Sequence, residues 1–168
     1  IVSKGPGSYT GIRIALTVAK VIAFALHIPM YVGSSLEILR NRDKKSFVVS
    51  NARSKRSYCA IYDKDKVLLN DCIKENSEVL EMLKNDKDLL LCGDTSYLGL
   101  EGYKADIADN LIHLKDEKHL CLNPMEVKPL YLKDNYDSNN LKIVVRKMLL
   151  SDLDQVMKIE NECFIHPY

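Results

Sequence analysis

The segment between Gly11 and Pro29 constrains the fold most, because it predicts a helix that is apolar almost all round. Its wide apolar face consists of Ile12, Ala15, Leu16, Ala19, Ile22, Ala23 and Leu26, and is extended by Ile14, Val18, Val21 and Ala25. A narrow polar stripe interrupts it at i, i+4, i+7 and i+14: Arg13, Thr17, Lys20 and His27. Such a helix has to be covered on most sides, by its own domain, by a preceding part of the protein or by a partner.

The composition is that of an ordinary globular protein. The 168 residues are 46% hydrophobic and 28% charged, which excludes fibrous and disordered chains and allows one domain or two small lobes. With 24 Lys and Arg against 23 Asp and Glu, no sequence-wide field would hold RNA or an anionic membrane. The polar stripe makes the apolar run 12–28 fall short of a predicted membrane span, and no segment resembles a signal peptide.

The five cysteines predict neither a disulfide framework nor a zinc site. Their number is odd, and the chain has no C-x-x-C pair and no histidine at ligand spacing from a cysteine. A reducing cytoplasm is therefore the expected location. The chain opens on Ile1 and closes just after a helical pattern, and we expect it to be a fragment of a longer protein.

The remaining pattern predicts a mixed α/β chain. A strand end at 1–3 precedes a glycine-rich turn, and Ser8 or Thr10 can cap the apolar helix. An extended link at 30–33, a helix from Ser34 or Ser35 to about Asn41, and three strands at 47–51, 56–62 and 66–72 follow. A helix capped by Ser77, a buried strand at 88–92 and a closing strand at 127–132 complete this part. The polar stretch 134–141 predicts a linker before a strand at 142–147 and a helix from Ser151.

Few residues suggest chemistry directly. The loop Gly5-Pro6-Gly7-Ser8-Tyr9-Thr10-Gly11 lacks the Lys-Ser/Thr end of a Walker loop, so it is either a tight turn or an anion or nucleotide site at Gly7, Ser8, Thr10 and Arg13. The basic tip Arg53, Lys55 and Arg56 is either a solvated loop or an RNA contact. Asp94 caps a turn or binds a hydroxyl or metal. The histidines fall in no recognisable triad motif.

The glycine-rich loop also carries a family resemblance. Gly5-Pro6-Gly7-Ser8-Tyr9-Thr10-Gly11-Ile12-Arg13, the pair Ala19-Lys20 and the element Val32-Gly33-Ser34-Ser35-Leu36-Glu37 resemble, in order and spacing, the TsaB (YeaZ) family. Asn51-Ala52-Arg53 with Tyr58, and Lys128-Pro129-Leu130-Tyr131-Leu132-Lys133, are similar to two further signatures of that family. The resemblance implies an actin-like, ribonuclease-H-like (ASKHA) α/β fold of two lobes. Residues 1–32 would be the remainder of an incomplete N-terminal lobe, and 33–133 the C-terminal lobe.

The resemblance implies a non-catalytic scaffold or regulatory subunit in the formation of threonylcarbamoyladenosine next to the tRNA anticodon. Its partners would be a paralogous TsaD-like threonylcarbamoyltransferase and a small TsaE-like ATPase, with tRNA contacted indirectly. A homodimer is the alternative, and ATP or ADP would bind only at an interface of the complex. The helix that binds the partner would present Ile12, Arg13, Leu16, Thr17, Ala19, Lys20 and Ala23.

The same resemblance argues against metal chemistry. In the catalytic paralogue a His-x-x-x-His metal pair stands where this sequence has Ser35 and Leu39. Neither a hydroxyl nor an aliphatic side chain replaces imidazole as an iron or zinc ligand. We therefore expect no metal and no catalytic residue in this part.

The last residues have a different resemblance. Ile143-Val144-Val145-Arg146-Lys147-Met148, the run from Asp152 to Glu160 and Cys163-Phe164 resemble the start of a RimI-type ribosomal-protein-alanine N-acetyltransferase. Residues 142–168 would then be the first strand and helix of a GNAT fold, ending before the acetyl-CoA-binding segment. Two alternatives to the scaffold function are a glycoprotease-like peptidase and, from this tail, an N-acetyltransferase.

Overall fold

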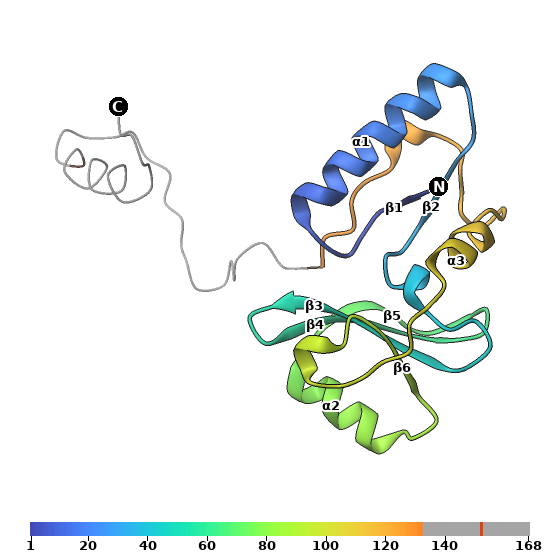
Figure 1. Ribbon diagram of the computed structural model, residues 1–168. Helices are drawn as coiled ribbons and strands as arrows, with labels where there is room; N and C mark the ends of the chain where they lie inside the picture. The colour runs from blue at the N-terminus through green and yellow to red at the C-terminus, as the bar shows by residue number, and fades with distance from the viewer. Residues whose placement is uncertain (133–151, 153–168) are drawn as a thin grey trace. The chain divides into compact units, whose positions relative to one another are not determined.

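Figure 1 shows the computed structural model of the chain, which describes residues 1–132 and residue 152. The chain divides into two compact units, Ile1–Asp134 and Asn135–Tyr168. Every helix and strand given below belongs to the first unit. The predicted linker and the predicted acetyltransferase strand lie outside the described residues, as does the predicted tail helix except for Asp152.

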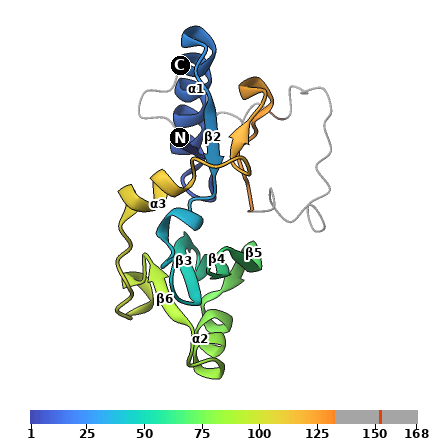
Figure 2. The ribbon, with the colours of Figure 1, turned by 90° about the vertical axis from the view of Figure 1, so that its right-hand side faces the viewer.

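A small mixed sheet forms the first part of the unit. Strand β1 (Val2–Ser3) runs parallel to β2 (Met30–Gly33), and β2 pairs antiparallel with β7 (Leu120–Cys121), giving the order β1-β2-β7. Because β7 comes from far along the chain, residues 1–32 alone do not complete this sheet. Helix α1 (Tyr9–Leu26) lies against this sheet (Figures 1 and 2). The buried apolar cluster between the helix and the sheet consists of Val2, Ile12, Leu16, Ala23 and Met30.

The ends of α1 match the predicted boundaries. The Ser8 hydroxyl accepts a hydrogen bond from the Gly11 amide at 3.3 Å, so Ser8 rather than Thr10 is the N-cap. At the other end His27 takes a left-handed conformation with φ 51°, and the Ile28 amide donates to the Ala23 carbonyl at 3.2 Å. This left-handed residue ends the helix just before Pro29.

A second sheet of four strands confirms the predicted meander and extends each of its strands. Strands β3 (Ser46–Arg53), β4 (Arg56–Asp63) and β5 (Lys66–Glu75) are antiparallel neighbours, and β6 (Leu90–Gly93) pairs parallel with β3. The order is β5-β4-β3-β6. Helix α2 (Asn76–Asn85) crosses from β5 to β6, and its N-cap is Glu75; Ser77 lies inside the first turn, so its predicted capping role is wrong.

The central strands of this second sheet are buried on both faces, because their side chains alternate between two apolar clusters. One face packs against α2 through Phe47, Val49, Cys59, Ile61 and Val79. The other face consists of Leu36, Val48, Ala52, Tyr58, Ala60, Tyr62 and Cys92. This period of two is the expected pattern of strands covered on both sides.

Two other predicted elements are wrong: a helix that reaches Asn41 and a closing strand at 127–132. Instead of a helix reaching Asn41, the chain forms a single 3-10 turn, η1 (Glu37–Leu39). The Asn110 amide, on α3 (Ile107–His113), donates to the carbonyls of Ile38 and Arg40 at 2.9 Å each. Those carbonyls therefore bond to a side chain instead of continuing a helical ladder.

The predicted closing strand at 127–132 is also absent as a regular strand. Two further 3-10 turns, η2 (Ser96–Leu98) and η3 (Pro124–Glu126), lie before it. After η3 the backbone bonds to the glycine-rich loop at one point, where the Leu130 amide donates to the Lys4 carbonyl at 2.7 Å. A single bond of this kind ties the segment to the loop without making a ladder.

Candidate functional site

The outward face of α1 is an exposed apolar surface. Six of its large apolar side chains are at least 45% accessible: Ile14, Val18, Val21, Ile22, Phe24 and Leu26. We call this set the α1 outer face. Six neighbouring apolar side chains of this size are an unusual exposure for a soluble protein and typical of an interaction site.

The buried face of α1 contains three residues of the predicted interface. Ile12, Leu16 and Ala23 pack on the first sheet, with Leu16 only 2% exposed, so these three side chains cannot contact a partner while the helix stays on its sheet. Among the predicted interface residues, Arg13 and Thr17 are exposed, and Ala19 and Lys20 are half-buried. The sequence correctly predicted that α1 has apolar residues on almost all sides, but it did not show which of them the first sheet would cover.

By length and composition alone, α1 is also long and apolar enough to cross a membrane, with a mean hydropathy of 1.6. The expectation that it falls short of a span is therefore wrong on these two criteria. One such helix is weak evidence, because core helices of soluble proteins pass the same test. Moreover, Ile12, Leu16 and Ala23 join α1 to the first sheet, and the Lys20 ammonium donates to the Met125 carbonyl at 3.3 Å.

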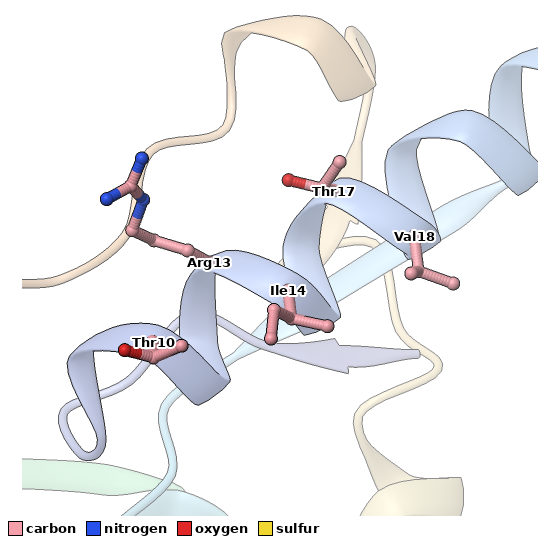
Figure 3. A pocket seen from close by; sticks show the side chains of 5 residues that line it. All are labelled: Thr10, Arg13, Ile14, Thr17 and Val18. Carbon is pink, nitrogen blue, oxygen red and sulfur yellow. The ribbon is translucent and has the colours of Figure 1, made fainter. Parts of the chain in front are cut away.

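A shallow hollow of about 350 Å³ lies on the first three turns of α1, next to the α1 outer face. Figure 3 shows the five side chains that line it, which are Thr10, Arg13, Ile14, Thr17 and Val18. The Arg13 guanidinium lies 5.3 Å from the ring centroid of Tyr9, which in turn stacks on Tyr131 at 4.7 Å. The lining of the hollow thus combines two residues of the α1 outer face, Ile14 and Val18, with one cation and two hydroxyls.

The glycine-rich loop is held tightly by its neighbours. The Gly5 carbonyl accepts from the Ser35 amide at 2.9 Å, and the Gly5 amide donates to the Ser3 hydroxyl at 3.1 Å. Gly5 has φ 103°, and a Cβ there would lie 3.0 Å from the Leu130 carbonyl oxygen. These contacts are those of a packed turn. Anion contact at Gly7, Ser8, Thr10 and Arg13 stays a prediction.

The positions compared with a metal pair have structural partners. The Ser35 hydroxyl lies 2.6 Å from that of Ser3, and Leu39 packs against the apolar cluster around Leu36. Within residues 1–132 no group of His, Cys, Asp or Glu side chains is arranged to hold a metal ion. Ser35 and Leu39 have neither the thiolate nor the imidazole group that would bind iron or zinc.

Two other candidates are surface features. Arg53, Ser54 and Lys55 form a hairpin tip with three consecutive positive φ angles of 61°, 51° and 59°, and all three are exposed. RNA contact by this tip stays a prediction. Asp94 accepts a hydrogen bond from the Ser96 hydroxyl at 2.8 Å, as expected of a residue that caps a turn.

A cluster that the sequence did not suggest surrounds His119. Its Nδ1 lies 2.6 Å from Asp116 and its Nε2 lies 3.0 Å from Glu37, which also lies 3.8 Å from the Lys118 ammonium. Desolvation opposes ionisation of Asp116, but hydrogen bonds from His119 outweigh it and lower the pKa of that carboxyl. Glu37 and His119 are 82 residues apart, so no spacing rule could have found the pair. The cluster joins η1 to the segment before β7.

Asp71 on β5 gives a testable pH dependence. It accepts a hydrogen bond from the Tyr62 hydroxyl at 3.2 Å, and burial raises the pKa of its carboxyl despite bonds from Ser34 and Tyr62. A raised carboxyl pKa contributes stability that is complete below the unfolded pKa of about 3.9 and is lost as pH rises through the folded pKa. Asp71→Asn should therefore raise the melting temperature by a few degrees at neutral pH, because its amide oxygen still accepts from Tyr62 without a buried charge.

Thermal unfolding measured between about pH 4 and pH 7 checks this expectation. The advantage of Asp71→Asn over the wild type should grow as pH rises through the acid range. Asp43→Asn, at an exposed aspartate, is the matched control and should follow the wild type. An advantage that stays constant with pH would contradict the burial of charge at Asp71.

The fold defines the class of protein first, as an α/β protein with two mixed sheets. Two solved structures from Pseudomonas aeruginosa share this fold at 19% identity. One, described as an uncharacterized protein with similarity to peptidase YEAZ, has a TM-score of 0.57 over 78% of this chain and 71% of its own. The other, YeaZ, has a TM-score of 0.55 over 77% and 72%.

The sequence comparisons then identify the family. The family described as "TsaD: tRNA N6-adenosine threonylcarbamoyltransferase" matches residues 1–135, and the chain belongs to this family. Within it, the TsaB protein of Bacillus subtilis (strain 168) is 40% identical over 106 residues, 57% of this chain and 46% of that protein. The TsaB protein of Buchnera aphidicola subsp. Schizaphis graminum (strain Sg) is 31% identical over 145 residues, 79% and 66%.

These relatives confirm the resemblance to TsaB (YeaZ) proteins. Both carry the name "tRNA threonylcarbamoyladenosine biosynthesis protein TsaB". The chain spans 46% and 66% of their lengths. The match to a RimI-type acetyltransferase has no counterpart among these findings.

Proposed function

We propose that this chain is the part of a TsaB-type subunit that binds a catalytic threonylcarbamoyltransferase paralogue, without itself performing the transfer. The observation that carries the proposal is the α1 outer face, a continuous exposed apolar surface on the helix that follows the family's glycine-rich loop. Covering this face removes apolar surface from water, which is the main driving force for stable association. The two TsaB relatives named above support the pathway.

Ser35 and Leu39, which stand where the catalytic paralogue has metal-binding histidines, support a non-catalytic role. The family description names a transferase, whereas Ser35 and Leu39 stand where the resemblance places two metal-binding histidines. Ser35 bonds to Ser3, and Leu39 packs in an apolar cluster. The division of labour that we propose leaves metal chemistry to the paralogue and gives this chain the contact surface.

The remaining components follow from the same proposal. A small ATPase of the TsaE type completes the complex, ATP or ADP binds at one of its interfaces, and tRNA contacts this chain only through its partners. The hollow that Thr10, Arg13 and Thr17 border is the place on this chain where an anionic group would meet a cation. The complex would act in the cytoplasm, and a homodimer through the same helix is the competing assembly.

Residues 142–168 are proposed to begin a fused RimI-type N-acetyltransferase domain. The support is the sequence resemblance alone, since these residues lie outside the described part except for Asp152. Acetyl-CoA would bind only to a complete domain. Calorimetric titration of acetyl-CoA into the longer protein tests this proposal independently of the first unit.

Reconstitution tests the main proposal. The longer protein is mixed with its threonylcarbamoyltransferase paralogue, the ATPase and a tRNA that reads codons beginning with A, and the modified nucleoside is quantified by mass spectrometry. Formation of threonylcarbamoyladenosine should require this protein and should be lost when the paralogue is omitted. Modification without this protein, together with metal-dependent peptide hydrolysis by it, would instead support the peptidase alternative.

A further inference from the structure

Two cysteines lie directly opposite each other on neighbouring strands of the second sheet. The antiparallel register of β4 and β5 pairs Cys59 with Cys72. Their sulfur atoms are 3.5 Å apart, and the Cys72 thiol also lies 3.6 Å from the Cys59 carbonyl oxygen, which it approaches as a donor. The two thiols therefore already share one site in the reduced protein.

The backbone at this site suits a covalent bond between them. Residues opposite each other in an antiparallel pair have Cα atoms about 4.5 to 5.5 Å apart, and disulfides span Cα separations of about 4.4 to 6.8 Å. The register shift between Cys59 and Ile61 begins immediately after the pair, so the ladder of hydrogen bonds between β4 and β5 is interrupted there. Closing the sulfur gap thus requires side-chain rotation and a small local adjustment rather than a new strand pairing.

The surroundings of the two thiols differ. Cys59 is fully buried in the cluster with Phe47 and Val79, whereas Cys72 lies at the margin of that cluster and is partly accessible. A small oxidant in solution can therefore reach Cys72 and not Cys59. Cys92 is buried in the cluster on the other face of the sheet, and Cys121 lies on β7.

We propose that Cys59 and Cys72 are a modification site at which a hydroperoxide forms a reversible disulfide. The Cys72 thiol loses its proton, and its thiolate attacks one peroxide oxygen, which breaks the O–O bond and gives a Cys72 sulfenic acid. With hydrogen peroxide the leaving group is hydroxide, which takes up the proton that the thiol released and becomes one water. The Cys59 sulfur then attacks the Cys72 sulfur; the S–S bond forms, the S–O bond breaks, and the departing hydroxide takes the Cys59 proton as a second water. Two electrons pass from the two sulfurs to the peroxide.

The second step is the slow one. Burial, followed by the neighbouring Cys72, raises the pKa of the Cys59 thiol above its usual range. A thiol with a raised pKa is rarely ionised at neutral pH, so brief exposure to peroxide should leave part of Cys72 as the sulfenic acid. Sustained exposure should close the bond, and a dithiol reductant should reopen it.

A disulfide between Cys59 and Cys72 would link the edge strand β5 covalently to β4. β5 lies at the end of the sheet order and pairs only with β4 among the described strands. A bond between Cys59 and Cys72 would restrict the unfolded chain between them and hold β5, with the neighbouring Asp71, on the sheet. The oxidised protein should therefore have a higher melting temperature than the reduced one.

Peptide mapping without reduction tests the proposal on the full chain after treatment with hydrogen peroxide. We expect a linked pair of peptides that contain Cys59 and Cys72, and an increase in melting temperature that dithiothreitol reverses. Cys121→Ser, a cysteine on the other sheet, is the matched control and should behave like the wild type. Cys72→Ser should give neither the linked peptides nor the increase.

Cys59→Ser, with folding checked by its thermal unfolding transition, gives a second and chemical readout. Its Cys72 sulfenic acid has no resolving thiol. A reagent that traps sulfenic acids, such as dimedone, added after sustained exposure to peroxide, should therefore label Cys72 in this variant and much less in the wild type, where the disulfide has closed. Linkage of Cys72 to a different cysteine, or labelling of Cys72 to the same extent in both proteins, would overturn the proposal.

Discussion

Val18→Glu should abolish the complex with the threonylcarbamoyltransferase paralogue at micromolar concentrations where the wild type forms it. Val18 lies within the α1 outer face and is 51% exposed, so a glutamate there is solvated in the free protein and leaves its fold intact. In the complex the same carboxylate would be buried without a partner, at a cost of several kcal/mol. About 3 kcal/mol is already more than a hundredfold in the dissociation constant.

Leu68→Glu provides the matched control for this experiment. Leu68 is on β5 of the other sheet and is 52% exposed, so the substitution has the same chemistry at the same exposure. Size-exclusion chromatography with light scattering on each variant, alone and with the paralogue, gives the result. Equal complex formation by both variants would place the interface elsewhere. A glutamate at Leu16 would not test the interface, because that side chain is buried and the variant would unfold.

Gly93→Ala should be the most destabilising small substitution in the second sheet. Gly93 ends β6 with φ 94°, and a Cβ there would lie 2.2 Å from the Val49 carbonyl oxygen. That oxygen also accepts from the Asp94 amide at 3.0 Å, so the clash would break a backbone bond at the end of the parallel pair. We expect a loss of at least about 4 kcal/mol in the free energy of unfolding, the range of the most severe single substitutions.

Gly99→Ala separates the steric clash from the cost of a left-handed backbone. Gly99 has φ 69°, and a Cβ there would meet nothing within 4 Å. Its substitution should therefore cost only the conformational term, about 1 to 2 kcal/mol. Urea denaturation of both variants measures the difference. Similar losses at the two glycines would mean that β6 can move away from Val49.

The sequence predicted the second sheet and α1 well because their signals are local. Alternating apolar residues in three strands, a serine that caps α1 and a proline just beyond its end each act within a few positions. The 3-10 turn η1 could not be foreseen, because Asn110 binds its carbonyls from 70 and 72 residues away. Tertiary contacts of this kind override local helical preference.

In the candidate site, too, local features could be predicted from the sequence and features that depend on tertiary contacts could not. Helical periodicity predicted that α1 has to be covered on most sides, and in the described unit its outer face is exposed. It could not separate Leu16, which the first sheet covers, from Val18, which stays exposed, because an apolar helix has no pattern that marks its inner face. The Cys59–Cys72 pair likewise depends on strand register, which the strand patterns alone did not fix.

The separation of β7 from β2 along the chain sets an order for folding during synthesis. The second sheet is built from consecutive residues between Ser46 and Gly93, whereas the first sheet waits for Leu120 and Cys121. Contacts between distant segments form late, since their loop entropy must be lost first. On the ribosome, α1 would therefore emerge before β7 completes the sheet on which it packs, with the α1 outer face uncovered. We expect this helix to be the segment of the nascent chain that chaperones bind most.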